Sequence, residues 1–163
     1  MNAQTNGAAP PQFGILRVYL KDVSFESPQS PAVFARNNLQ PAIEVQMHVE
    51  TRPIAAEQGI YEVVLGVTAT AKADNQSLFL AEVQQAGLFH VSGLPTDDLP
   101  KALEIACPNV LLPFAREAVA DLVGKGGFPP LMLQPVNFEV LYQRKREPAK
   151  AQPEATQVSG ATH

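Results

Sequence analysis

The chain has 163 residues, of which 45% are apolar and 17% are charged, and its formal net charge at pH 7 is −4. This length is enough for one globular domain with its own core and too short for two large domains. The acidic balance argues against a protein that binds nucleic acid, because such proteins neutralise phosphates with clustered Lys and Arg. The charged fraction lies below the roughly 25% usual for soluble domains, so we expect apolar surface that a partner covers.

The start of the chain and its cysteine content indicate where the protein works. Residues 1–12 lack the basic flank and apolar run of a signal peptide, and no stretch approaches the roughly 20 apolar residues that span a bilayer. Cys107 is the single cysteine, which excludes an intrachain disulfide and any Cys-rich zinc site and is typical of a reducing compartment. We therefore expect a soluble, cytoplasmic protein.

Both ends of the chain differ in composition from its centre. Residues 1–12 and 144–163 are rich in Ala, Pro, Gln, Thr and Gly and contain no aromatic residue, so both are predicted to be disordered. Residues 13–143 carry eight Lys and Arg against fourteen Asp and Glu, whereas residues 144–163 carry four against two. The sequence thus predicts one acidic domain over residues 13–143, followed by a mildly basic tail. Its basic run at residues 144–146 fits a solvated end better than a site for nucleic acid or lipid.

Residues 15–26 alternate between apolar and polar side chains, which is the period of a half-buried strand. The alternation slips by one residue at Lys21 and Asp22, and this slip predicts a β-bulge. Beyond it Val23 and Phe25 continue the apolar face, and the polar face consists of Asp22, Ser24 and Glu26. Residues 27–41 contain three prolines and are predicted to form a long crossover connection that still carries apolar side chains.

Three further strands are predicted from the same alternation, at residues 43–50, 61–71 and 79–91. Pro53 is expected to end the first of these. Residues 73–76, with the sequence Ala-Asp-Asn-Gln, are expected to form a hairpin turn.

After Pro95 the period of the apolar residues becomes helical. Thr96 is a candidate helix cap, and residues 99–106 and 111–122 fit two successive helices. A short amphipathic segment at residues 138–142 follows an apolar linker. Strands followed by helices predict an α+β domain, a four-stranded antiparallel sheet packed with helices from the C-terminal half.

No side chains combine into a catalytic or metal-binding set. His48 and His90 occupy strand positions without Cys or carboxylate ligands at metal-binding spacing, so structural or surface roles are favoured over metal binding. An activated thiolate at Cys107 is the less favoured alternative to a buried structural cysteine. Asp97 and Asp98 fit a helix N-terminus better than a paired-carboxylate site. We expect no enzyme, no metal and no cofactor.

Apolar side chains outside the regular strands are the remaining signal. They occur in the crossover connection, in the linker at residues 131–133 and in the last segment, and each of them could belong to the core. Because they are concentrated in loops and terminal segments of a chain with few charges, we hypothesise an apolar groove.

Six short motifs occur in one order across the predicted domain. They are KDVSFE from Lys21, YEVVL from Tyr61, EVQQ from Glu82, CPN from Cys107, PFARE from Pro113 and PVNF from Pro135. Together they resemble the bacterial protein-export chaperone family SecB, and the resemblance covers residues 13–143.

The resemblance implies a cytoplasmic homotetramer, a dimer of dimers, that binds unfolded precursor proteins without ATP and passes them to the translocation motor SecA. The family fold is a four-stranded antiparallel sheet backed by helices, and no reaction is catalysed. In the family SecA docks on an acidic sheet face, and the zinc at that contact belongs to SecA. The matching positions are Asp22, Glu26, Leu80 and Glu82.

The resemblance also implies residues for client binding and for assembly. Client-binding positions lie in the crossover connection, the second strand and the last helix, and they correspond to Phe34, Leu39, Ile43, Val45, Met47, Leu141 and Tyr142. Met and aromatic side chains suit many unrelated sequences because their contacts are large and adaptable. Tetramer assembly uses the first long helix and the inner row of the fourth strand, which corresponds to Ala81, Val83 and Gln85.

Two other functions stay open at this point. The first is a SecB-like chaperone dedicated to one partner, such as an antitoxin, and the acidic face argues against it because such a protein needs no motor-docking surface. The second is a small-ligand enzyme of α+β fold, for which the sequence offers no converging acid, base and nucleophile.

Overall fold

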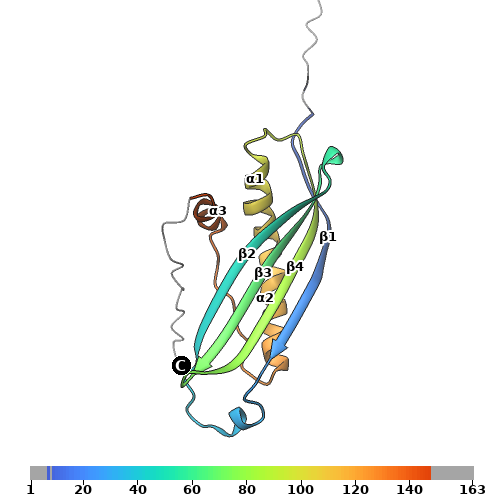
Figure 1. The fold of residues 1–163 in the computed structure, drawn as a ribbon. Coiled ribbons are helices and arrows are strands. Elements are labelled where there is room, and N and C mark those ends of the chain that lie inside the picture. Colours follow the sequence, from blue (N-terminus) through green and yellow to red (C-terminus); the bar gives the residue numbers. More distant parts are fainter. Residues whose placement is uncertain (1–6, 8, 148–163) are drawn as a thin grey trace, which may run out of the picture.

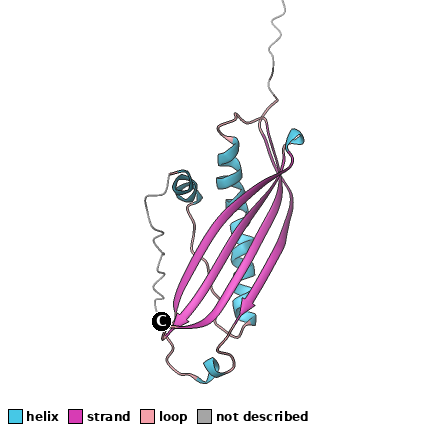
Figure 2. Ribbon diagram, in the orientation of Figure 1, coloured by secondary structure: helices cyan, strands magenta, loops and turns pink. Residues whose placement is uncertain are grey.

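The computed structural model describes Gly7 and residues 9–147. Its four strands are β1 (Gln12–Glu26), β2 (Ala42–Ala55), β3 (Ile60–Ala73) and β4 (Gln76–Ser92). All neighbouring strands are antiparallel and lie in the order β1-β4-β3-β2, so β1 and β2 form the two edges (Figure 1). The α-helices of the described part come from the C-terminal half, as the sequence colours of Figure 1 show, and the long helical stretch lies along the sheet (Figure 2). The predicted α+β fold is confirmed.

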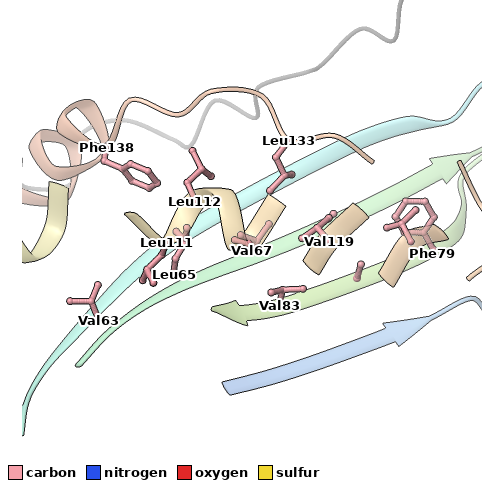
Figure 3. Packing of buried hydrophobic residues seen from close by; sticks show 14 of the residues in the cluster. Val63, Leu65, Val67, Phe79, Val83, Leu111, Leu112, Val119, Leu133 and Phe138 are labelled. Atoms are coloured by element: carbon pink, nitrogen blue, oxygen red, sulfur yellow. The ribbon is translucent and has the colours of Figure 1, made fainter. Parts of the chain in front are cut away.

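The core lies between the sheet and α2 (Cys107–Lys125). Alternate residues of β3 and β4 face this helix, and most of them are apolar and buried, including Val63, Leu65 and Val67. The buried side of α2 includes Leu111, Leu112, Ala115, Val119 and Val123, several of which Figure 3 shows next to the strands. Removing this apolar surface from water is the main favourable contribution to folding.

The helical residues after Pro95 form one continuous stretch, so the prediction of two separate helices is wrong. α1 (Leu99–Lys101) continues through a π-helical segment (Ala102–Ala106) directly into α2. The π turn ends just before Pro108, where the regular helix loses a backbone donor, and such a turn adjusts the register without breaking the helix. Thr96 does not cap this stretch, because the N-cap position is Asp98, whose side chain makes no capping hydrogen bond.

The sheet confirms most of the predicted strand details. The register of β1 shifts between Leu20 and Asp22, as predicted. The hairpin turn between β3 and β4 places Asp74 and Asn75 at φ values of 51° and 60°, as a tight type I′ turn requires. β2 continues past Pro53, where we expected it to end, because an edge strand can direct a missing N–H away from its neighbour.

A second shift in the register of β1, between Ile15 and Arg17, was not predicted. Short 3-10 turns occur in the β1–β2 connection (η1, Ala32–Ala35) and between β2 and β3 (η2, Ala56–Gln58).

The last helix, α3 (Phe138–Arg146), begins at Asn137, whose side-chain oxygen accepts hydrogen bonds from the backbone N–H groups of Glu139 and Val140 at 3.1 and 3.2 Å. α3 extends three residues beyond the predicted domain end at residue 143. Lys145 holds this extension through an ion pair with Glu104 at 3.2 Å. Residues 148–163 of the predicted tail, and residues 1–6 and 8 of the predicted disordered N-terminus, lie outside the described residues.

Candidate partner-docking and client-binding surfaces

The face of the sheet opposite the helices, which we call the outer face, collects acidic side chains at one end. Strand pairing sets Glu26 opposite Leu80 and Ser24 opposite Glu82, so these residues lie in two adjacent rows. Asp22 follows in the next row of β1. The structure therefore brings the four predicted docking residues together on one surface, which we call the acidic surface: Asp22, Glu26, Leu80 and Glu82.

Among the described residues, the carboxylates of the acidic surface have a polar neighbour but no cationic one. Ser24 Oγ donates a hydrogen bond to Glu82 Oε2 at 3.1 Å. Across residues 9–147, no Lys or Arg nitrogen lies within 4.0 Å of a carboxylate oxygen of Asp22, Glu26 or Glu82. Carboxylates that surround the half-buried Leu80 form a surface suited to a cationic partner with an apolar contact.

Glu44 on β2 is an acidic residue of this surface that the sequence analysis did not single out. It pairs with Thr70, and Thr70 pairs with Leu80, so Glu44 shares a row with Leu80 and Glu26. The alternation of β2 already places Glu44 on the polar face of that strand, and only the strand order reveals that this face adjoins the acidic surface.

At the other end of the outer face, a buried carboxylate connects three strands. Glu62 on β3 is 6% exposed and accepts hydrogen bonds from Lys21 Nζ at 2.8 Å and from the Tyr19 hydroxyl, both on β1. Arg52 on β2 forms an ion pair with the same carboxylate at 3.1 Å. The hydrogen bonds from Lys21 and Tyr19 lower the pKa of Glu62. Burial and the hydrogen bond to Glu62 raise the pKa of Tyr19 to about 12.

Most of the predicted client-binding residues form an apolar row on the helix side of β2. Ile43, Val45 and Met47 alternate along the strand, are half-buried and pack against the core. Leu39, just before β2, and Leu141 of α3 are half-buried in the same way. We call these five residues the β2 row, after the strand that carries three of them.

Tyr142, the other predicted client-binding residue of α3, is less accessible than the β2 row. Its side chain is buried, and its hydroxyl accepts a hydrogen bond from Arg146 Nη1 at 2.8 Å. The Arg146 guanidinium also lies over the Tyr142 ring, 5.2 Å from the centroid, so both the ring and the hydroxyl have partners within α3.

Phe34 in the crossover connection is 54% exposed but has aromatic support. Its ring centroid lies 5.5 Å from that of Phe128 in the α2–α3 linker, and the Phe128 ring lies 5.0 Å from Phe79 on β4. Gly127 has a φ of 86° and leaves room for the Phe34 ring, because a Cβ at this glycine would lie 3.0 Å from Phe34 Cζ. Phe34 is thus exposed to solvent on one side and packs against Phe128 on the other.

Met132 is a further exposed apolar residue in the linker after α2, with 60% of its surface accessible. Met132 belongs to the apolar run at residues 131–133, which is not among the predicted client-binding residues. The neighbouring Leu133 is buried, and this difference in exposure between two adjacent apolar residues is visible only in the structure.

The residues predicted for tetramer assembly are buried within the chain itself. Ala81, Val83 and Gln85 face the helix side of β4, and Gln85 Nε2 donates a hydrogen bond to the Tyr19 carbonyl at 3.0 Å. Their role in assembly stays a prediction.

Most of the exposed large apolar residues of the sheet lie on edge strand β1. Four of them face the helix side with 42 to 52% of their surface accessible, and we call them the β1 row: Phe13, Ile15, Leu20 and Val23.

The two strand histidines and Cys107 lie in surroundings that fit structural roles. His48 lies against Gly66, where a Cβ would meet the imidazole ring, and His90 pairs with Gly14 and Ile60 within the sheet. Burial raises the pKa of Cys107 to about 12, which disfavours its thiolate. Among the described residues, no group of three or more His, Cys, Asp or Glu could hold a metal ion. No helix in the described part is long and apolar enough to cross a membrane.

Comparisons with known proteins agree with this architecture. The family model described as preprotein translocase subunit SecB matches residues 6–149. The protein-export protein SecB of Dechloromonas aromatica is 47% identical over 142 residues, which cover 86% of this chain and 91% of that protein. That of Acidithiobacillus ferrooxidans is 48% identical over 132 residues, covering 81% and 88%.

A solved structure also has a similar fold. A SecB-like chaperone of Mycobacterium tuberculosis, solved in complex with a peptide from an antitoxin, matches with a TM-score of 0.64 at 19% identity, covering 76% of this chain and 90% of that one. The match to the family model and the relatives of 47 and 48% identity show that the chain belongs to the SecB family of protein-export proteins.

Proposed function

We propose that this chain is an ATP-independent chaperone of the cytoplasm, which binds unfolded precursor proteins, keeps them competent for translocation and delivers them to the SecA motor. Membership of the SecB family and the shared name of its relatives, protein-export protein SecB, support this function. The protein catalyses no reaction and needs no cofactor of its own.

The observation that carries the proposal is that the two candidate surfaces lie on opposite faces of the sheet. The acidic surface lies on the outer face, whereas the β2 row lies on the helix side. A client and SecA therefore need not compete for the same residues. The chaperone can then hold a client while SecA binds, which delivery of the client to SecA requires.

On the helix side, clients contact the β2 row together with Phe34 and Met132. These side chains are apolar and half-buried or exposed, and they come from a strand, two connections and a helix. Only an unfolded chain offers apolar segments extended enough to occupy several such sites at once, and simultaneous occupation raises the overall affinity. Selection of unfolded chains then requires no sequence motif.

On the outer face, the acidic surface binds a basic, zinc-bearing tail of SecA. Its carboxylates have no Lys or Arg partner in the described part of the chain, so they can attract a cationic segment, and Leu80 supplies an apolar contact at the centre. The zinc is part of SecA and not of this chain.

Assembly into a dimer of dimers is supported by the exposed edge of the sheet. β1 is an edge strand, and a long edge with an exposed apolar row is a site for pairing with another chain. Pairing with a second copy would cover the β1 row and account for the low charged fraction of the chain.

The experiment that tests this function asks whether client and motor bind together. The purified protein is saturated with a permanently unfolded polypeptide and then titrated with SecA by calorimetry. We expect a SecA affinity within about twofold of that of the client-free protein. Mutually exclusive binding, or no binding of the unfolded polypeptide, would contradict the proposal.

A further inference from the structure

The bulge at Lys21 decides which side chains of β1 beyond it lie on the outer face of the sheet. Leu20 pairs with Gln85 and Asp22 pairs with Gln84, so Lys21 is an extra residue that has no partner on β4. If β1 were regular through this point, Lys21 would pair with Gln84, and Asp22 would point toward the helix side. The bulge at Lys21 therefore keeps Leu20 on the helix side of the sheet and Asp22 on the outer face.

The bulge is held from the outer face by Glu62. This carboxylate accepts hydrogen bonds from the extra residue itself, Lys21, at 2.8 Å and from the hydroxyl of Tyr19 two positions earlier. Glu62 is fixed in turn by Arg52 on the far edge strand at 3.1 Å. The extra residue is thus connected across β4 to β3 and β2.

The bulge is also held from the helix side by Gln85. A bulge disrupts the ladder locally and leaves backbone groups in need of other partners. Gln85 Nε2 donates to the Tyr19 carbonyl at 3.0 Å, and Gln85 itself is buried. Two side chains on opposite faces of the sheet therefore hold the same segment of β1.

We propose that Glu62 and Gln85 are positioning residues for motor docking: together they hold the bulge at Lys21 and so orient Asp22 and Glu26 toward the outer face. This inference rests on the proposed docking of SecA at the acidic surface. Neither residue belongs to that surface, because Gln85 faces the helices and Glu62 lies at the opposite end of the outer face.

The test compares variants of Glu62 by titration with purified SecA. Glu62→Leu removes both hydrogen bonds to β1, and we expect SecA affinity to fall roughly fivefold. Glu62→Gln removes the same charge but keeps an oxygen that can accept from Lys21, and we expect affinity within about twofold of the unchanged chain. Equal losses in the two variants would mean that the charge of Glu62 acts directly on SecA and would overturn the proposal.

A deletion of Lys21 supplies a second, independent test. Without the extra residue β1 becomes regular and still directs Asp22 outward, so the deletion variant should bind SecA within about twofold and should lose no further affinity when Glu62→Leu is added. A further loss in that background comparable with the loss in the full chain would contradict the positioning role. Gln85→Leu is the matched change on the helix side. If it does not fold, the Glu62 series decides alone.

Two controls separate this inference from the proposed function. Glu82→Lys alters the acidic surface itself, and if it leaves SecA affinity unchanged, the docking proposal fails. If Glu82→Lys weakens SecA but Glu62→Leu does not, only the positioning role fails. Affinity for an unfolded polypeptide should be unchanged in Glu62→Leu, because the β2 row lies on the other face. A parallel loss of client affinity would indicate general unfolding and overturn the proposal.

Discussion

The ring of Phe25 on β1 occupies the space beside Gly126 in which a larger residue would place its side chain. A Cβ built on Gly126 would lie 2.1 Å from Phe25 Cζ. Phe25 also stacks on Phe79 of β4, with ring centroids 5.9 Å apart. The end of α2 is thus seated against the sheet, and the linker that follows carries Phe128 toward Phe34.

This contact makes Gly126 sensitive to a single methyl group. Gly126→Ala should destabilise the chain by about 1–3 kcal/mol, because the added Cβ meets a packed aromatic ring. Gly124→Ala is the matched control, since its Cβ would lie 3.7 Å from Pro130 Cγ and the change should stabilise the helix by about 0.5–1 kcal/mol. Urea unfolding of both variants checks this, and equal effects would contradict the packing described.

Charge reversal on the acidic surface should weaken SecA binding. Glu82→Lys places a cation among Asp22, Glu26 and Glu44, and we expect a loss of roughly tenfold at low ionic strength, smaller at high salt because salt screens exposed charges. Glu57→Lys in η2 makes the same change in net charge away from that surface and serves as the control. Titrations at two salt concentrations measure both, and equal losses would show that net charge alone matters.

The β1 row should determine the oligomeric state. Ile15→Asp introduces a charge into the proposed contact between copies, and light scattering should report a smaller assembly. Ile54→Asp is the control, because Ile15 and Ile54 are 52% and 51% exposed but Ile54 lies on the other edge strand. A full-size assembly for Ile15→Asp would show that assembly does not use this edge.

Glu62 should contribute to the acid sensitivity of folding. Its pKa in the folded chain is below its ordinary value of 4.5, chiefly because Lys21 donates to it. The stabilisation is therefore fully present above that ordinary value and is lost as the pH falls through the lower folded value. Between pH 6 and strongly acidic pH, the free energy of unfolding of Glu62→Gln should fall less steeply than that of the unchanged chain, and identical slopes would contradict this role.

The sequence predicted those parts of the fold that local patterns determine. The bulge at Lys21 was visible because polar and apolar residues exchange faces there, whereas the shift near Leu16 was hidden because Ile15 and Leu16 are both apolar. The two predicted helices are one stretch because the chain stays helical through the π turn at Ala102–Ala106 and through Pro108 in the first turn of α2, and apolar periodicity does not report such a turn.

The candidate surfaces depended more on long-range contacts. Asp22, Glu26, Leu80 and Glu82 were predicted from the resemblance, and the strand pairing places them side by side. Glu44 joins them only through the order of strands, which alternation within one strand cannot give. Likewise, the burial of Tyr142 depends on how α3 packs on the rest of the chain, which lies beyond a local pattern.

Size-exclusion chromatography with light scattering shows whether this chain holds unfolded polypeptides. The protein is run alone and mixed with one polypeptide in its permanently unfolded and its folded forms. We expect the mass of four chains, with uptake of the unfolded form only. A monomer, or binding that does not distinguish the two forms, would contradict it.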